Sequence, residues 1–384
     1  MPGAAPSPPV SSSGMSAVLV EPDRLDRAQR AAAAGGLAAL LITPGPDLRW
    51  LTGYDAKLLE RLTALVVPAG GQPFAVVPAL EVPAAEASSL GTLPVEIIGW
   101  GETEDPYAVV AARLGPLGGS VGLANRMWAE QVLRFRAALP SAEQVLASEV
   151  LADLRMRKSP LEVEGLRAAG AAIDRVHARM GEWLRVGRTE RAVARDIATA
   201  ILDEGHHRVD FVIVGSGPNG ASPHHEVGDR VIAAGDPVVV DIGGTHEGGY
   251  CSDCTRMYVL GHPPAQFRDY VEVLYEAQVA AVEHVRPGVS AESVDTAARS
   301  LITAAGFGES FIHRTGHGIG VETHEEPYIV EGNATVLEPG MAFSVEPGIY
   351  LPGRHGARIE DIVVVTQDGV ERLNTTDRRP VTLG

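Results

Sequence analysis

Three histidines and three acids lie within fifteen consecutive residues, HRTGHGIGVETHEEP (313–327). The histidines are His313, His317 and His324, and glycines interrupt the segment. Imidazole and carboxylate groups bind divalent metals and transfer protons, so this composition allows a metal site, a proton relay or only a polar loop. The choice among these depends on whether carboxylates elsewhere in the chain meet the histidines.

A second group of acids lies in a predicted β-hairpin, VVVDIGGTHEGGYCSDCTRMY (238–258). A turn centred on Glu247 would place Asp241 directly opposite Asp253, at a cross-strand distance of about 5 Å. Like charges this close on a half-buried strand pair need a proton or a metal ion. Both residues could be ordinary acids near a loop, but Asp241 ends the apolar run VVVD, which favours the buried pair.

Two further acids lie in AFSVEPGIYLPGRHGARIEDIVVV (342–365). Glu346 is predicted to close one strand, which Pro347 and Gly348 break, and Glu360 is predicted to lie inside the next strand. Arg358 and Glu360 are two residues apart and therefore share a face of that strand. Alone, Glu360 is equally well explained as a surface acid paired with Arg358. Together with the hairpin acids, it becomes a fourth convergent carboxylate.

The cysteines Cys251 and Cys254 offer a competing metal site, C-S-D-C. Positions three apart on a strand point to opposite faces, so the two thiols cannot bind one ion together, and we interpret the pair as incidental. Cys251 shares a face with Asp253. With two cysteines in the chain, a disulfide scaffold is excluded and a cytoplasmic location is predicted.

The elements that must position these residues form two groups, and the first is an α/β layer with apolar strands covered by helices. We read it as a support or specificity domain. Its predicted helices cover 23–37, 104–114 and 129–139, and its predicted strands cover 38–44, 64–70, 74–79, 95–100 and 120–124.

The second group mixes long helices with strands joined by short turns, which predicts an α+β domain built on an antiparallel sheet. Ser159 is the predicted N-cap of a helix from Pro160 to about Val186, and Glu162 completes a capping box. Thr189 is the predicted cap of the next helix. The remaining predicted helices cover 264–285 and 291–306, and the strands cover 208–216, 236–244, 249–260, 342–351 and 357–373.

Composition sets the broad class of the protein. A chain of 384 residues with 45% hydrophobic residues suits two globular domains. We predict a disordered tail over 1–14, the α/β domain over 15–151 and the α+β domain over 152–384. The formal charge of -17 argues against nucleic-acid and anionic-membrane partners, because phosphate binding needs clustered cations. The sequence has no apolar run near the roughly 20 residues of a membrane helix.

Taken in order, four motifs resemble those of the pita-bread metallopeptidases, the family of prolidase, aminopeptidase P and methionine aminopeptidase. The motifs are DIGGTHEGGYCSDCTR, HRTGHGIGVETHEEP, SVEPGIY and ARIED. GPDLRWLTGY (45–54) also resembles the amino-terminal domain that prolidase and aminopeptidase P share. The resemblance implies a C-terminal pita-bread catalytic domain, of the creatinase/aminopeptidase type, preceded by a smaller creatinase-like α/β domain.

The resemblance also implies a set of five metal ligands: Asp241, Asp253, His317, Glu346 and Glu360. They would hold two divalent ions, with Asp253 and Glu360 as bridging carboxylates. Four carboxylates balance two dications and leave room for a bridging hydroxide that attacks the peptide bond. One imidazole among oxygen donors suits Mn²⁺ best, with Co²⁺ and Zn²⁺ as the alternatives.

Further histidines match positions that act on the substrate in the family. His224 follows a proline and would approach the scissile carbonyl, while the adjacent His225 is interpreted as a loop residue. His324 would hydrogen-bond the reacting carbonyl, and His313 would contact the substrate.

The resemblance assigns four residues to proton transfer. Glu346 would carry a proton from the bridging water to the leaving nitrogen. Tyr350 and Arg358 match flanking relay residues of aminopeptidase P. Asp47 matches the acid of that relay, although an aspartate before a strand is more often a turn residue.

Two features depart from the family pattern. Asp241 and Asp253 are twelve positions apart, one more than the pattern, and the turn sequence EGG could absorb the insertion. Tyr328 follows HEEP where prolidases often carry an arginine that binds the free carboxylate of the dipeptide. A tyrosine cannot supply that charge, so either another cation does so or the enzyme accepts longer peptides.

The leading hypothesis is a cytoplasmic, homodimeric Xaa-Pro dipeptidase whose substrate is a small peptide with proline at the second position. The alternative is aminopeptidase P, which releases the first residue of longer Xaa-Pro peptides. Methionine aminopeptidase fits less well, because its catalytic domain normally lacks the first α/β domain. A non-catalytic pita-bread binding protein, or a metal-free creatinase-like hydrolase, would be expected to lose ligands that this chain keeps.

Overall fold

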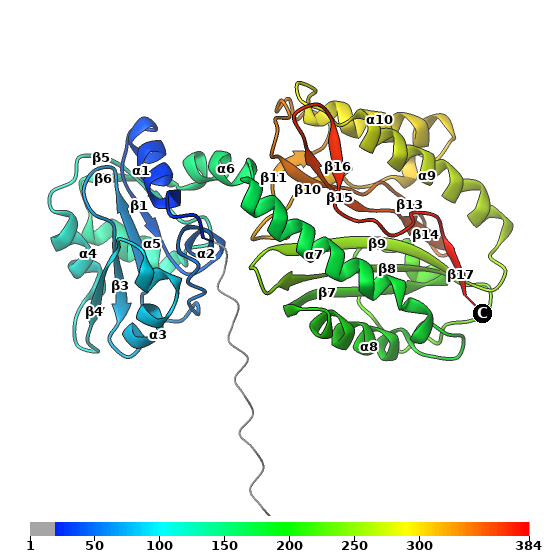
Figure 1. Cartoon of the computed structure of the whole chain (residues 1–384), viewed down its shortest axis with the longest axis horizontal. Helices are drawn as coiled ribbons and strands as arrows, with labels where there is room; N and C mark the ends of the chain where they lie inside the picture. The colour runs from blue at the N-terminus through cyan, green and yellow to red at the C-terminus, as the bar shows by residue number, and fades with distance from the viewer. Residues whose placement is uncertain (1–19, 384) are drawn as a thin grey trace, which may run out of the picture.

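The computed structural model describes residues 20–383, which form two bodies that lie side by side (Figure 1). The predicted tail over 1–14 lies outside the described residues. The first body contains, in chain order, α1 (Arg24–Ala34), β1 (Leu37–Ile42), α2 (Pro46–Thr52), β2 (Ala64–Pro68), β3 (Phe74–Pro78), α3 (Val82–Ala87), η1 (Ser89–Thr92), β4 (Glu96–Trp100), α4 (Pro106–Leu114), β5 (Gly119–Leu123), α5 (Ala129–Ala138), β6 (Ala142–Leu146) and α6 (Ser148–Met156).

A six-stranded sheet, in the order β4-β3-β2-β1-β5-β6, forms the centre of the first body. Its central strands β1, β2 and β3 are apolar because each face is covered: Leu40 and Ile42 of β1 pack toward α1 and α2, whereas Ala39 and Leu41 pack toward α4 and α5. The predicted α/β layer is confirmed. The sheet is mixed, since β1–β2 and β2–β3 are antiparallel and the other pairs are parallel.

The second body carries most of the long helices. In chain order it contains α7 (Pro160–Ala178), η2 (Met180–Glu182), α8 (Glu190–Asp203), β7 (His206–Ser216), η3 (Gly217–Ala221), β8 (Pro237–His246), β9 (Cys251–Leu260), α9 (Ala265–His284), α10 (Ala291–Ala304), η4 (Gly308–Ser310), β10 (Gly316–Gly318), β11 (Glu325–Ile329), β12 (Ala342–Val345), β13 (Gly348–Leu351), β14 (His355–Arg358), β15 (Asp361–Val365), β16 (Val370–Arg372) and β17 (Val381–Leu383).

Two sheets of the second body face each other. One has the order β17-β9-β8-β7, the other β11-β10-β12-β15-β16, and β13 and β14 form a separate ribbon. α7 and α8 share a core with the first sheet, and α9 and α10 share a core with the second. The helices therefore lie on the outside (Figure 1), and the inner faces of the sheets are left for other residues. The predicted α+β domain is confirmed; its sheets are antiparallel except for the pair β17–β9.

The predicted helix caps are confirmed. Ser159 Oγ accepts from the Glu162 amide at 3.2 Å, and the Glu162 carboxylate accepts from the Ser159 amide at 2.9 Å. Thr189 Oγ1 accepts from the Ala192 amide at 3.2 Å.

The predicted extent of the first long helix is wrong. α7 ends at Ala178 rather than near residue 186. A 3₁₀ turn follows, and Met180 and Leu184 pack into the core beneath α7 and α8. The chain must turn back there because α8 covers the same sheet.

Two predicted strands are interrupted. The strand predicted over 342–351 ends at Val345 and resumes as β13, and the strand predicted over 357–373 is divided into β14, β15 and β16. At both interruptions the chain passes between the second sheet and the ribbon β13–β14. Glu346 and Glu360 lie at these crossings, so Glu360 is not inside a strand as predicted.

A buried acid on α7 fastens the first body to the second. Glu162 Oε1 accepts from the Trp50 indole at 2.7 Å and from the Tyr250 hydroxyl at 3.1 Å, and it lies 3.1 Å from the Arg24 guanidinium. Arg24 and Trp50 belong to the first body and Tyr250 to the second. The same Glu162 that caps α7 therefore also fixes the position of α7 against the first body.

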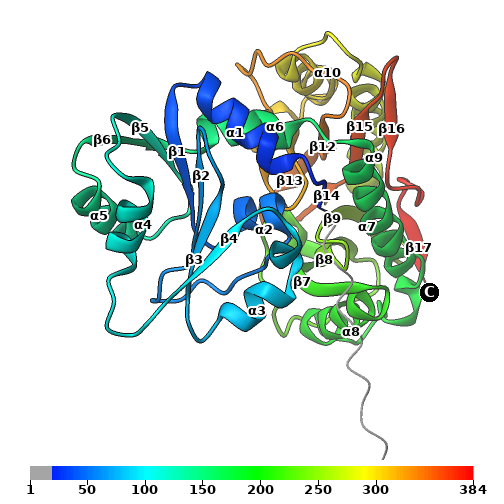
Figure 2. The same cartoon turned by 60° about the vertical axis from the view of Figure 1, so that its left-hand side comes forward.

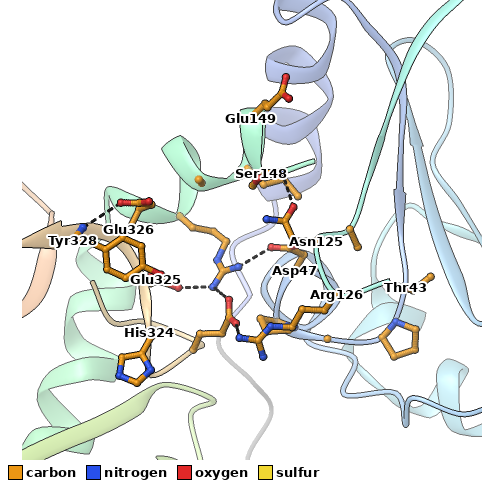
Figure 3. A pocket seen from close by; sticks show the side chains of 18 residues that line it. Thr43, Asp47, Asn125, Arg126, Ser148, Glu149, His324, Glu325, Glu326 and Tyr328 are labelled. Atoms are coloured by element: carbon orange, nitrogen blue, oxygen red, sulfur yellow. Dashed lines mark hydrogen bonds and ion pairs between the residues drawn. The ribbon is translucent and has the colours of Figure 1, made fainter. Parts of the chain in front are cut away.

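A second buried cluster surrounds Arg155 of α6. Its guanidinium lies 2.7 Å from Asp47 of the first body and 2.8 Å from Glu322 of the second, and it also pairs with Glu325. Lys158 pairs with Glu325 as well. Figure 3 shows Asp47 and Glu325 on opposite sides of the pocket between the bodies. Burial disfavours the ionised form of Glu325, but Lys158 and Arg155 hold its pKa below the usual value.

We expect Arg155→Met to lower the free energy of unfolding at pH 7 by about 2–4 kcal/mol, because Glu325 loses one of its two buried cations. A depressed carboxyl pKa stabilises the folded state above the unfolded pKa of about 4.3, and this stabilisation is lost as the pH falls through the folded pKa. The difference in unfolding free energy between the two proteins should therefore narrow as the pH falls below about 4. Urea denaturation at several pH values measures it.

The control is Arg157→Met, two residues away. The Arg157 side chain is 36% exposed and its partners Asp153 and Glu338 are more exposed still, so its loss should cost less than about 1 kcal/mol. An equal decrease in the free energy of unfolding in the two variants would contradict the prediction that the buried Arg155 cluster stabilises the fold more than the exposed Arg157 pairs do.

Candidate metal centre

The hairpin of β8 and β9 places two acids on the inner face of the first sheet. Val240 and Ile242 point into the core beneath α7 and α8, so Asp241 between them points inward. The predicted register is wrong: Gly243 pairs with Asp253, and Asp241 pairs with Thr255. The hairpin is centred one residue later than predicted, because the turn occupies residues 246–250. Asp241 and Asp253 are therefore diagonal neighbours on one face rather than direct partners.

His317 reaches the same region from the second sheet, on the short strand β10. A Cβ atom at Gly316 would lie 1.8 Å from the Ser344 carbonyl oxygen, and one at Gly318 would lie 2.2 Å from the Glu326 carbonyl oxygen. Only glycine permits this close packing of β10 between β11 and β12. The glycines on either side of the histidine are therefore required by the sheet that carries it.

The ring of His317 has a fixed orientation. Nδ1 lies 3.1 Å from the Gly318 carbonyl oxygen and so carries a hydrogen, which turns Nε2 toward the acids. Nε2 lies 3.1 Å from Glu346 Oε1 and 3.7 Å from Asp253 Oδ2. A histidine whose second nitrogen donates to a backbone carbonyl is the arrangement that metal-binding histidines usually adopt.

Two hydroxyl groups orient the remaining carboxylates. Ser344 Oγ donates to Glu346 Oε1 at 3.0 Å and accepts from the His317 amide at 3.0 Å. Thr255 Oγ1 donates to Glu360 Oε2 at 2.7 Å. Neither hydroxyl was predicted from the sequence. Each nevertheless lies two residues from a predicted ligand and therefore points to the same side of the chain as that ligand.

Glu360 is not a surface acid. Its side chain is 1% exposed, and within residues 20–383 it forms no ion pair with Arg358. Arg358 instead pairs with Asp241 and donates to the Tyr350 hydroxyl at 2.7 Å. The alternative that treated Glu360 and Arg358 as a surface pair is therefore wrong.

The buried acids have too few positively charged neighbours to balance them. Burial, followed by the charges of Glu360 and Asp241, raises the pKa of Asp253, and burial together with Glu346 and Asp241 raises the pKa of Glu360. In the described residues, Asp241 Oδ1 is buried without a hydrogen-bond partner. Candidate ligand atoms of Asp253, His317 and Glu360 lie within 4.8 Å of one another. This donor set, rich in oxygen with one imidazole, fits a divalent cation.

A cavity of about 820 Å³ opens onto the acids. All five predicted ligands line it, and so do the three predicted substrate-contacting residues, His224, His313 and His324, and the predicted relay residue Arg358. His224 comes from the loop after η3, and the His324 ring lies 4.1 Å from the His317 ring. Desolvation in the cavity and the neighbouring His317 lower the pKa of His324 to about 4, so this imidazole is neutral near pH 7.

Glu346 differs from the other acids in its protonation. Burial opposes its ionisation, but the hydrogen bond and charge of His317, with His313 and Arg358, hold its pKa at about 2. Glu346 is thus a carboxylate near neutral pH. It projects into the cavity at the crossing between β12 and β13.

A directed chain of hydrogen bonds leads from Asp241 to His313. The Arg358 guanidinium donates to Asp241 and to the Tyr350 hydroxyl, and Tyr350 lies 2.8 Å from His313 Nε2. His313 Nδ1 lies 2.7 Å from the Arg314 carbonyl oxygen and therefore carries the hydrogen. Tyr350 must then donate to His313, and burial keeps it protonated by raising its pKa to about 12.

The proposed relay acid Asp47 lies elsewhere. It pairs with Arg155 in the pocket between the bodies, and it contacts neither Tyr350 nor Arg358 in the described part of the chain (Figure 3). His225 is a loop residue as predicted, but Glu190 holds its ring at 2.8 Å from the carboxylate. No local signal in the sequence indicated that Glu190, at the start of α8, would bind this loop.

The cysteines do not contribute. Cys251 packs in the core that continues into the first body, and Cys254 packs beneath α7 and α8, so they point to opposite faces as predicted. Both are buried and free. Among residues 20–383, every helix is too short or too polar to span a bilayer.

Comparison with known proteins follows the division into two bodies. Residues 164–367 match the model of "Metallopeptidase family M24", and residues 24–157 match that of the "Creatinase/Prolidase N-terminal domain". The predicted boundary at 151/152 lies within α6, inside the first matched region and six residues before its end at residue 157.

Individual relatives span almost the whole chain. It is 54% identical to a "Probable dipeptidase PepE" of Mycobacterium tuberculosis over 91% of this chain and 93% of the relative. It is 38% identical to an "Xaa-Pro dipeptidase" of Lactobacillus helveticus over 86% and 91%. The crystal structure of dipeptidase PepE from Mycobacterium ulcerans superposes with a TM-score of 0.89 at 52% identity, covering 94% of this chain and 97% of that one.

We expect metal-free protein to gain thermal stability when Mn²⁺ is added, by about 2.7 kcal/mol at a hundred times the dissociation constant. Asp253→Asn should reduce this gain. The same variant should stabilise the metal-free protein by about 0.5–2 kcal/mol, because it removes one of the buried like charges. Thermal unfolding with and without Mn²⁺ measures both effects.

Asp229→Asn is the matched control, since the Asp229 side chain is 80% exposed, pairs with Arg191 and is not among the residues that line the cavity. It should leave the Mn²⁺ response unchanged. An undiminished response in Asp253→Asn would remove Asp253 from the ligand set.

Proposed function

The chain belongs to metallopeptidase family M24, and from this premise we propose that it is a dinuclear-metal dipeptidase that hydrolyses the Xaa-Pro bond of dipeptides. The chain is a metal-dependent peptidase, and its relatives named above are dipeptidases. One observation carries the proposal. The five candidate ligands line a single cavity, and three further histidines, His224, His313 and His324, line the same cavity.

Asp241, Asp253, His317, Glu346 and Glu360 would hold two divalent ions, with Asp253 and Glu360 between them. Mn²⁺ is the proposed metal, because four carboxylates and one imidazole favour a hard cation over one that prefers thiolates. When bound, such ions polarise the peptide carbonyl and make hydroxide available near neutral pH. The raised pKa values of Asp253 and Glu360 support this assignment, since cations would stabilise their ionised forms.

The histidines of the cavity would bind and polarise the scissile carbonyl. His324 is neutral near pH 7 and can donate one N–H to the carbonyl oxygen as negative charge develops there. His224 reaches the cavity from a separate loop and would contact the same group. These two rings would restrict the carbonyl to one orientation.

Glu346 would transfer the proton of the reaction. As a carboxylate it accepts a proton from the attacking water, and it then donates this proton to the proline nitrogen as the C–N bond breaks. Ser344 and His317 fix its position from one side. The chain Arg358–Tyr350–His313 would hold Asp241 and the substrate-contacting ring of His313 in place.

The lining of the cavity includes an apolar wall. Phe211, Ile213 and Pro223 line it together with Ile312, whose side chain is 65% exposed. An exposed isoleucine in a catalytic cavity is suited to contact an apolar ring such as proline. This wall supports proline next to the scissile bond.

We further propose that the enzyme is a cytoplasmic homodimer. The two free, buried cysteines support a reducing compartment. The dimer rests on the family resemblance, and light scattering of the purified protein tests it.

We expect Mn²⁺-loaded enzyme to cleave Ala-Pro but not Ala-Pro-Ala or longer Xaa-Pro peptides. Liquid chromatography of the products with each peptide at equal concentration measures this preference. Faster cleavage of the longer peptides would identify an aminopeptidase P instead. Absence of cleavage of all of them, despite bound metal, would favour the non-catalytic binding protein.

His324→Asn should lower kcat by about 100- to 1,000-fold, because it removes a donor aimed at the developing oxyanion. Stabilisation by Mn²⁺ should persist, since His324 is not among the proposed ligands. Loss of the Mn²⁺ response together with activity would show instead that His324 supports the metals.

A further inference from the structure

A dipeptide substrate presents a chemical problem that the metal site does not solve. Its free carboxylate lies one residue beyond the scissile bond and carries a full negative charge near pH 7. The acids of the cavity repel that charge, so a site specific for dipeptides needs a cation within reach of the substrate's carboxyl end.

Most arginines near the cavity are already paired. Arg358 binds Asp241, Arg126 binds Glu322, and Arg155 binds three acids. Arg314 differs from these: it lines the cavity, and within residues 20–383 its side chain forms neither an ion pair nor a hydrogen bond. Its guanidinium therefore remains available for a ligand.

The Tyr328 ring positions the Arg314 guanidinium. The guanidinium carbon lies 4.3 Å from the ring centroid, which is the geometry of a cation–π contact. Tyr328 is itself fixed on β11, because its amide donates to Glu326 Oε2 at 3.1 Å and its carbonyl accepts from Asn333 at 2.6 Å. Figure 3 shows Tyr328 and His324 on the second body, across the pocket from Arg126.

Arg314 also has the right neighbours for the end of a dipeptide. It lies two residues after Ile312, and both line the cavity. A proline ring packed against Ile312 would bring its carboxylate within reach of Arg314, which lines the cavity two residues further along the same segment. A planar guanidinium suits this role because its parallel N–H groups match the two oxygens of a carboxylate.

We propose that Arg314, stacked on Tyr328, binds the free carboxylate of the dipeptide and thereby selects dipeptides over longer peptides. This assignment rests on the proposed dipeptidase function. It also gives Tyr328 a role: the tyrosine carries no charge, and it holds the charge that Arg314 supplies.

The test compares Ala-Pro with its amide, Ala-prolinamide, in Mn²⁺-loaded wild-type enzyme and in Arg314→Gln. Wild type should prefer the acid. Arg314→Gln should lose this preference by about ten- to a hundredfold, chiefly through a higher KM for the acid, because the contact exists before and during the reaction. Arg314→Lys keeps the charge without the fork and should lose part of the preference.

Two further comparisons test whether the Tyr328 ring positions the Arg314 guanidinium and whether another nearby cation contributes. Tyr328→Leu should weaken the preference for the acid, whereas Tyr328→Phe keeps the ring and should retain it. Arg126→Gln is the matched control, because Arg126 lies in the adjoining pocket and already binds Glu322. It should retain the wild-type preference.

The outcomes distinguish this assignment from the function on which it rests. Wild-type enzyme that cleaves neither compound would overturn both. Wild-type enzyme that cleaves both with equal KM would overturn the assignment alone, as would Arg314→Gln that keeps the preference for the acid. Loss of the preference in Arg126→Gln, with retention in Arg314→Gln, would move the carboxylate site to Arg126.

Discussion

Burial and neighbouring acids raise the pKa of Asp253 and of Glu360, and the surrounding chain offsets this crowding of acids only in part. Arg358 neutralises Asp241, and Thr255 donates one hydrogen bond to Glu360. Hydroxyl donors orient a carboxylate but supply little charge. The remaining deficit is a property of the fold, because the acids come from both sheets and cannot separate without unfolding one of them. Such stored repulsion is what a divalent cation relieves.

The layering of the second body explains how the fold tolerates buried acids with too little positive charge around them. Helices cover the outer face of each sheet, and the apolar residues of the strands point toward those helices. The inner faces can then carry polar residues without loss of the hydrophobic cores. The first body lies against the second (Figure 2), and Glu162 and the cluster around Arg155 attach the two bodies to each other. The hydrophobic cores that stabilise the second body therefore lie between the sheets and their helices, and the inner faces of the sheets can carry the polar residues of the site.

The sequence predicts what depends on local pattern. The apolar run VVVD predicts both the strand and the buried position of Asp241, and Ser159 with Glu162 predicts the start of α7. Register and interruption depend on contacts between distant segments. The hairpin is centred one residue later than predicted, and β12 ends and β15 begins where the chain passes between their sheet and the ribbon β13–β14. The Arg155 cluster joins residues more than a hundred positions apart, so no local pattern indicates it.

Charge on the whole molecule and charge in the cavity have opposite effects on a dipeptide. A net charge of -17 repels a carboxylate, but salt screens that field beyond about 8 Å at physiological ionic strength. Recognition of the carboxylate must then come from a contact of a few ångströms. Arg314 meets this requirement because the ring of Tyr328 fixes it without neutralising it, whereas a carboxylate partner would have cancelled its charge. An aromatic neighbour thus suits a cation that must bind an anion in an acidic protein.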